Sequence, residues 1–294
     1  GCTTPAWSKE PVEPGASGFV QAQYNPRNRP GQFNKSLTIT TDFSDQPIRL
    51  YIKGNVIPKP KTIEEELPTD LGGIRVRYRS FNIGKVMTTD EPTVKSFEIY
   101  NNTDSTISFM DRYEGPEFIS LVFEPKSLQP KAKGEIKVVY NGKAHNDLGF
   151  SNQSVTFFTN QSEALAAKDI SIFATVLEYF PPMSNEELSK APILKVEEFV
   201  HDFGKINGTE KVSTNFILTN SGESVLSIRE TEANCSCTYA TLKKDEIKPG
   251  KQIEMAVEFD PKGRRGNQQK SVTIYSNDPR NPVQRITIKA YIEN

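Results

Sequence analysis

The stretch that decides the fold is CTYATLKKDEIKPG, residues 237–250, because the chain carries the same pattern earlier, as CTTPAWSKEPVEPG at residues 2–15. The two copies keep a spacing of 235 positions as far as Pro47 and Pro282. An internal repeat defines a structural unit before any secondary structure is assigned. We therefore expect residues 1–57 to be the C-terminal half of one such unit.

A third copy of the pattern lies between these two, 119 positions before the last one. Residues 97–101 match 216–220, and residues 136–140 match 255–259. The spacing gives a unit of about 110 residues, the size of one compact domain. The predicted organisation is a half unit at 1–57, a linker at 58–71, a full unit at 72–180, a linker at 181–191 and a full unit at 192–294.

Apolar residues at every second position predict strands throughout the chain. Ile253, Met255, Val257 and Phe259 form the clearest such run. A period of two gives one buried and one solvated face, and Pro-Gly, Asn-Gly and Asp-Pro turn pairs separate the runs. The sequence therefore predicts an all-β protein of tandem immunoglobulin-like sandwiches.

Composition excludes several classes of function. With 35% hydrophobic residues and a formal net charge of −1, the chain has enough apolar residues for separate cores and no net attraction to nucleic acid or anionic membranes. No run of eighteen or more apolar residues predicts a membrane span. Within the second linker, Ser184 and Glu187 have the spacing of a capping box and predict one short helical turn.

The chain has three cysteines, Cys2, Cys235 and Cys237. If Cys235 and Cys237 lay in a strand, their side chains would face the same way, near one another but not ideally placed for a disulfide. Four interpretations stay open: packed thiols, a disulfide with or without redox use, a Cu(I) or Zn(II) pair, and attachment to another molecule. The middle unit has Pro116 and Phe118 at these positions, so the fold does not need the cysteines.

Nothing in the sequence predicts catalysis or a bound cofactor. A closed zinc site needs four ligands, and only His145 and His201 could join Cys235 and Cys237. Neither histidine has a catalytic motif around it, and the chain contains no phosphate-binding glycine loop. We expect a protein that is not an enzyme.

The segments GCTTPAWSKEPVEPG (1–15), DFGKI (202–206) and CSCT (235–238) together resemble a bacterial family of uncharacterised domains. That family is abundant in Bacteroidota, carries a Cys-Gly-Cys-Thr motif, and is related to Hydin-type and major-sperm-protein-type sandwiches. The resemblance implies export to the periplasm or cell surface, in some members as a lipoprotein, with no assigned reaction. Ser105, within Asp104-Ser105-Thr106, is similar to the O-glycosylation sequon of Bacteroidota envelope proteins.

The predicted function is that of an interaction or spacer module of the cell envelope, with a protein partner. A carbohydrate- or peptide-binding module and a redox or copper-handling protein are the alternatives. A half-sandwich leaves its inner apolar face uncovered, so residues 1–57 are expected to pack on the middle unit, pair with a second molecule, or bind a separate N-terminal fragment. We further expect the segments 141–151 and 160–168 to lie together at one end of the middle unit and to contact the partner.

Overall fold

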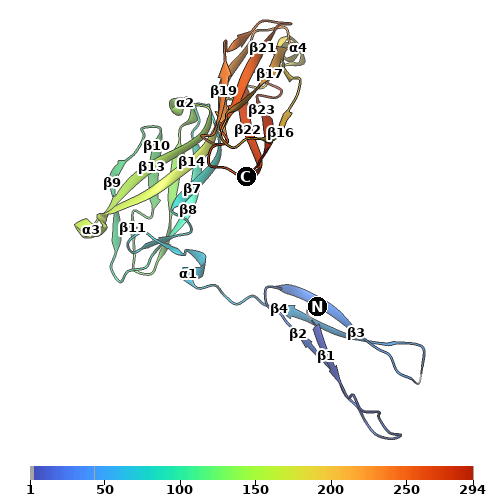
Figure 1. Cartoon of the computed structure of the whole chain (residues 1–294). Helices are drawn as coiled ribbons and strands as arrows, with labels where there is room; N and C mark the ends of the chain where they lie inside the picture. The colour runs from blue at the N-terminus through green and yellow to red at the C-terminus, as the bar shows by residue number, and fades with distance from the viewer. Residues whose placement is uncertain (1–2, 43, 294) are drawn as a thin grey trace. The chain divides into compact units, whose positions relative to one another are not determined.

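In a computed structural model, which describes residues 3–42 and 44–293, the protein is built almost entirely of β-strands (Figure 1). It divides into two compact units, Gly1–Glu66 and Leu67–Asn294. The second unit contains two separate hydrophobic cores, one for each of two sandwiches, which we call the middle and the last sandwich. The all-β, immunoglobulin-like fold is as predicted; the domain boundaries stay a prediction.

The first unit consists of two antiparallel strand pairs, which we call the half-sandwich. Strand β1 (Thr3–Trp7) pairs with β2 (Val20–Tyr24), and β3 (Gly31–Ile39) pairs with β4 (Ile48–Val56). A short helix α1 (Ile63–Glu66) follows.

The middle sandwich stacks two sheets. The strand order in the first sheet is β10-β12-β8-β6-β5, and in the second β11-β9-β13-β14-β7. The elements are β5 (Thr69–Asp70), β6 (Ile74–Val76), β7 (Ser80–Met87), β8 (Thr93–Asn101), β9 (Ile107–Glu114), β10 (Ile119–Glu124), β11 (Ser127–Leu128), β12 (Lys133–Tyr140), α2 (Gly142–His145), β13 (Gly149–Thr159), α3 (Glu163–Ala166) and β14 (Ala167–Leu177).

The last sandwich repeats this plan. Its sheets have the orders β15-β17-β21-β19 and β16-β23-β22-β18-β20. In each sandwich one edge strand of the second sheet runs parallel to the last strand in the chain: β7 runs parallel to β14, and β16 runs parallel to β23. The elements are α4 (Asn185–Lys190), β15 (Leu194–Val196), β16 (Val200–Ile206), β17 (Val212–Asn220), β18 (Leu226–Ala233), β19 (Thr238–Leu242), β20 (Glu246–Ile247), β21 (Gln252–Phe259), β22 (Gly266–Ser276) and β23 (Val283–Ile292).

The four strands of the half-sandwich match β19, β21, β22 and β23 of the last sandwich; the two-residue strand β20 has no counterpart among the described strands. Thr3 pairs with Tyr24 as Thr238 pairs with Phe259, both at a spacing of 235. The prediction that the spacing of 235 holds as far as Pro47 and Pro282 is wrong for β4, the final strand of the half-sandwich. Ile39 pairs with Ile48, whereas Ile274 pairs with Gln284, so β4 matches β23 at a spacing of 236. The connection before β23 is one residue longer, and Pro47 and Pro282 are not structural equivalents.

Gly204, in the DFGKI segment, sits in a β-bulge where the pairing of β16 with β23 shifts register. Its φ of +66° favours glycine, and its N–H donates to the Asp202 carboxylate at 2.8 Å. Gly84 has the same arrangement in β7: its φ is +93°, and its N–H donates a hydrogen bond to the Asn82 side-chain oxygen at 2.8 Å. The signature is thus a bend on an edge strand.

Polar contacts join the middle and last sandwiches. The Arg229 guanidinium donates two hydrogen bonds, each 3.0 Å, to the Glu178 carboxylate. Glu232 Oε2 accepts the Phe150 N–H and the Tyr275 hydroxyl, both at 3.1 Å. Burial, with the Glu232 charge second, raises the pKa of Tyr275.

The second linker forms α4, and the predicted capping box is confirmed. Ser184 Oγ accepts the Glu187 N–H at 3.2 Å, and the Glu187 carboxylate accepts the Ser184 N–H at 2.7 Å. The helix is held on the last sandwich by Ser224, whose hydroxyl donates to the Lys190 carbonyl at 2.6 Å. The linker is therefore an ordered connection rather than a loose tether.

The prediction that segments 141–151 and 160–168 lie together is wrong. The first contains α2, which lies before β13, and the second contains α3, which lies after it, so the eleven-residue extended strand β13 runs from one helix to the other. Helices α2 and α3 lie at opposite ends of the middle sandwich (Figure 1). The first segment also ends at the contact between Phe150 and Glu232, and so belongs partly to the joint between the sandwiches.

None of the helices in the described ranges is long and apolar enough to cross a lipid bilayer.

Candidate interaction site

The two strand pairs of the half-sandwich face each other, with Tyr24 of β2 stacked on Phe33 of β3 at 3.8 Å between ring centroids. Within the described residues, neither pair has the further strands that complete the two sheets of the last sandwich, so the inner face is only partly covered. Among its described side chains none is buried, and Val20 and Leu50 are 40% and 46% exposed. Their equivalents in the last sandwich, Met255 and Ile286, are both fully buried at 0%. The same strand positions therefore form a core in one region and an open surface in the other.

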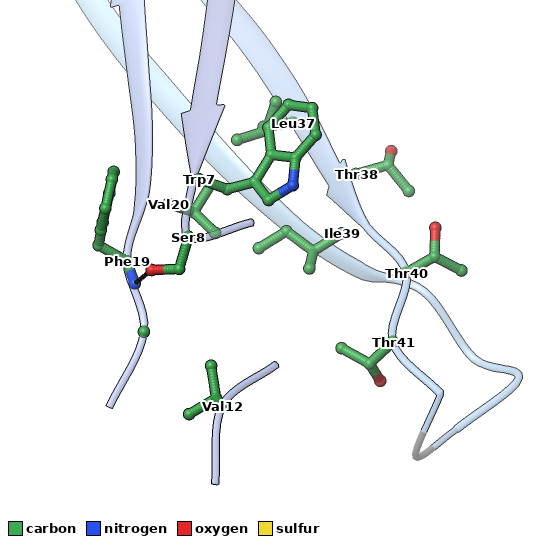
Figure 2. A pocket seen from close by; sticks show the side chains of 11 residues that line it. Trp7, Ser8, Val12, Phe19, Val20, Leu37, Thr38, Ile39, Thr40 and Thr41 are labelled. Carbon is green, nitrogen blue, oxygen red and sulfur yellow. Dashed lines mark hydrogen bonds between the residues drawn. The ribbon is translucent and has the colours of Figure 1, made fainter. Parts of the chain in front are cut away.

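This face contains a hollow of about 580 Å³ between the ends of β1, β2 and β3. Figure 2 shows the Trp7 indole beside Leu37, with Ile39 and Val20 next to it. The apolar members of its lining are Trp7, Val12, Phe19, Val20, Leu37 and Ile39. Trp7, Val12 and Phe19 are each more than half exposed, so the hollow is an apolar patch open to solvent.

Local turns shape the hollow. Ser8 and Phe19 hold the ends of β1 and β2 together, through a backbone bond at 3.0 Å and a bond from the Phe19 N–H to Ser8 Oγ at 2.9 Å, the latter drawn in Figure 2. Between them, Gly15 has φ +81° and the Ala16 N–H reaches the Glu13 carbonyl at 2.9 Å. Pro14 and Gly15 thus form the type II turn that their sequence favours.

Unpaired strand edges border the same face. In the last sandwich β21 lies between β17 and β19, and β22 lies between β18 and β23. The equivalent strands β2 and β3 each have one partner within the described residues. Their outer N–H and C=O groups are therefore free to accept another strand.

Trp7, Val12 and Phe19 were not among the residues expected on this face. The period-two rule selected Val20, Ala22, Tyr24, Leu37, Ile39, Leu50 and Ile52; it passed over Trp7, at the end of the short strand β1, and Val12 and Phe19, which lie in the connection to β2. The repeat could have found Trp7, which aligns with Leu242, packed against the core of the last sandwich, and Val12, which aligns with Ile247, 1% exposed.

Cys235 and Cys237 are joined by a disulfide, with sulfur atoms 2.05 Å apart and Cα atoms 5.2 Å apart. They do not lie in a strand, as the sequence argument assumed, but in the turn between β18 and β19. The Thr238 N–H closes this turn on the Cys235 carbonyl at 3.3 Å. The turn brings the two side chains together where a strand would hold them apart. Cys2 lies outside the described residues.

The middle sandwich forms the same turn without sulfur. Its Ile119 N–H donates to the Pro116 carbonyl at 3.0 Å. Phe118, which stands where Cys237 stands, contacts the His145 ring at 4.2 Å between centroids. Burial lowers the pKa of His145, with the Asp147 charge opposing it. His145 therefore packs against Phe118 and is mostly uncharged at pH 7.

The other candidate ligand and modification sites are also placed. His201 packs edge-on against Phe203 at 4.6 Å. Within residues 3–42 and 44–293, no group of three or more His, Cys, Asp or Glu side chains is arranged to hold a metal ion. Ser105 is exposed in the turn between β8 and β9; its modification stays a prediction.

Comparison with known proteins gives the family. A family described as "Protein of unknown function (DUF1573)" matches residues 1–56 and 194–292, which is more than half of the chain. The protein belongs to the DUF1573 family. The match covers the half-sandwich and the last sandwich and leaves out the middle one, the repeat that departs most from the sequence pattern. No curated protein matches the chain.

Solved structures show the fold. A protein of unknown function from Porphyromonas gingivalis W83 is similar with a TM-score of 0.54 and 18% identity, over 75% of this chain and 100% of that one. The PapD-like domain 7 of human CEP192 (TM-score 0.32, 10% identity, 40% of this chain and 94% of that one) and the periplasmic chaperone SfaE (0.30, 11%, 75% and 100%) are more distant. The DUF1573 chain thus shares its architecture with this Porphyromonas gingivalis protein.

Proposed function

We propose that this DUF1573 protein is a non-catalytic, exported protein of the cell envelope that acts through its tandem immunoglobulin-like sandwiches as an interaction and spacer module. The observation that carries the proposal is the open apolar face of the half-sandwich. An exposed apolar patch bordered by unpaired strand edges is typical of a surface that binds another polypeptide. The middle and last sandwiches, joined through Glu178, Arg229 and Glu232, then act as the spacer.

Periplasmic or cell-surface location, with a lipoprotein anchor in a longer precursor, is part of this proposal. The support is the family resemblance, together with the disulfide between Cys235 and Cys237, since disulfides persist in oxidising compartments. Fractionation of the source cells tests it. Recovery of the protein only from the cytosol would contradict the proposed location.

The binding role is tested with two substitutions on β3. Leu37→Asp places a charge on the open face, whereas Ser36→Asp places it on the exposed opposite face and serves as the matched control. The full chain and both variants are immobilised and incubated with envelope extract, and the bound proteins are quantified by mass spectrometry. We expect a protein that binds the full chain and Ser36→Asp but not Leu37→Asp. Equal recovery on all three would contradict the proposal.

A specific observation favours each alternative function. For peptide binding, edge strand β7 and strand β8 border a groove of about 750 Å³ in the middle sandwich, lined in part by Arg77, Arg79 and Lys95. For a redox role, Cys235 is only partly buried and so within reach of an attacking thiolate. A reduction potential well below about −300 mV would mark the disulfide as structural instead.

A further inference from the structure

The internal repeat indicates which kind of polypeptide segment would bind at the open face. In the last sandwich, residues 194–233 supply β15, β16, β17 and β18, which complete the two sheets beside the strands that are equivalent to the half-sandwich. This segment is the front half of the repeat, and the half-sandwich is the back half.

The pairing register in the last sandwich shows where each partner residue would lie. On β21, Phe216 lies opposite Met255, and on β22, Ala233 lies opposite Val272. At the spacing of 235 these two receptor positions correspond to Val20 and Leu37 of the half-sandwich. A segment with the pattern of β17 and β18 would therefore pair with β2 and β3 and bring its apolar side chains over the hollow.

A buried asparagine adds specificity to this pattern. Asn220, at the end of β17, is 0% exposed, and its Nδ2 donates to the carbonyls of Ser224 and Ile247, each at 2.8 Å. Its backbone carbonyl accepts the Gly250 N–H at 2.9 Å, and its backbone N–H donates to the Lys251 carbonyl at 3.0 Å. One residue thus satisfies several groups around the Pro-Gly turn.

The middle sandwich repeats this arrangement. Asn101, also 0% exposed, donates to the Leu128 carbonyl at 2.9 Å and to the Ser105 carbonyl at 2.8 Å, and its own carbonyl accepts the Lys131 N–H at 3.0 Å. The asparagine is therefore part of the repeat itself and not a peculiarity of the last sandwich.

The half-sandwich has the receptor groups without the asparagine. Val12, Gly15 and Ala16 stand where Ile247, Gly250 and Lys251 stand. Within the part of the chain that the structure describes, no hydrogen bond satisfies the Gly15 N–H or the carbonyls of Val12 and Ala16. The backbone of this turn resembles that of the last sandwich, since φ is +81° at Gly15 and +68° at Gly250. The three groups therefore already have the conformation in which a partner could bind them.

We propose that the open face of the half-sandwich binds a polypeptide segment carrying the front half of this same repeat: an apolar strand that pairs antiparallel with β2 and ends in an asparagine seated on the Pro14-Gly15 turn, followed by a strand that pairs with β3. This proposal rests on the proposed binding role of the same face and names the chemistry of its partner.

Trp7 makes the proposal measurable. It is the chain's single tryptophan, it lines the hollow, and its side chain is 54% exposed. A synthetic peptide of residues 192–233, the front half from the last sandwich, contains neither tryptophan nor tyrosine. It is titrated into the full chain while Trp7 emission is recorded. We expect a saturable shift of the emission to shorter wavelength, as the indole leaves water.

Two peptide variants distinguish specific binding through the asparagine from non-specific hydrophobic binding. Asn220→Ala removes the amide and leaves one receptor carbonyl, that of Val12, and the peptide's own Ser224 carbonyl without this donor, which should weaken binding by about tenfold or more. Asn215→Ala changes an exposed asparagine of the same strand and should bind as the parent peptide does. A peptide with the parent composition in scrambled order should not bind.

Each other outcome overturns the proposal. Absence of a Trp7 shift with the parent peptide contradicts it, as does equal binding by the Asn220→Ala and Asn215→Ala peptides. A Trp7 shift that follows protein concentration without peptide, with a dimer in sedimentation, would show that a second copy covers the face. In that case the Leu37→Asp result still tests the binding role separately, so the failure of this proposal and of the proposed function can be distinguished.

Discussion

The middle and last sandwiches have the same strand order, apart from the extra edge strand β5 of the middle one, and form the same turn before β10 and β19. The side chains in that turn differ. The last sandwich has the Cys235–Cys237 disulfide, whereas the middle one packs Phe118 against His145. The backbone bonds that close the two turns are nevertheless the same. The comparison shows that main-chain hydrogen bonding defines the turn, and that its side chains are free to change.

Asparagine is the opposite case, because the two sandwiches do not vary it. Removing the Asn220 side chain takes the donor from the buried bond to the Ile247 carbonyl and from the partly buried bond to Ser224; removing Asn101 does the same for the buried bond to Leu128 and the partly buried bonds to Ser105 and Gln129. We expect each Ala variant to lose about 3 kcal/mol of unfolding free energy. Urea denaturation measures it, with the exposed Asn215→Ala as control. If Asn220→Ala cost no more than this control, the buried amide would not be a stabilising part of the repeat.

The disulfide is predicted to matter less. Because the middle sandwich forms its turn without sulfur, Cys235→Ser with Cys237→Ser should cost at most about 1 to 2 kcal/mol. Circular dichroism during denaturation gives the value, and reduction of the unmutated chain should give a similar one. Unfolding of the whole last sandwich in the double variant would show that the covalent link, and not the backbone, holds the turn.

A third difference lies at the Pro-Gly turn. Lys131 of the middle sandwich adopts φ +56° where the last sandwich has Gly250 at φ +68°. Since a side chain strains this conformation, Lys131→Gly should be more stable than Lys131→Ala by about 1 kcal/mol. The Ala variant controls for the loss of the Lys131 contact with Asp104. Equal stability of the two variants would mean that the turn relaxes without cost.

The smallest expected effect is on pH dependence, and it belongs to the middle sandwich. Burial lowers the pKa of His145 below its usual value of 6.5, so the unfolded chain binds a proton that the folded chain does not. Stability should therefore fall as the pH drops from 6.5 through the folded pKa, and be unaffected by this group above 6.5. His145→Gln should flatten that part of the profile of melting temperature against pH. An unchanged profile would assign the pH dependence to other groups.

The candidate site illustrates the limits of sequence reasoning. The strand positions Val20, Leu37 and Ile39 follow from alternation, and all three line the open hollow. Trp7 joins them because β1 pairs with β2 and places it opposite Val20, and Val12 joins them because the connection turns back at Pro14 and Gly15. No local sequence pattern predicts these two positions. Likewise, two cysteines separated by one residue do not show whether they lie in a strand or in a turn, and the turn decides whether they can bond.

By itself, the sequence determined the all-β class, the repeat, the half unit at the amino end and the Pro-Gly turns, because these depend on side-chain period and on backbone preferences of neighbouring residues. Only the tertiary structure decided the shifted register of β4 against β23, the opposite ends taken by α2 and α3, and the seating of Asn101 and Asn220. Each of these depends on pairing between residues far apart in the chain, where one extra residue in a connection changes every partner beyond it.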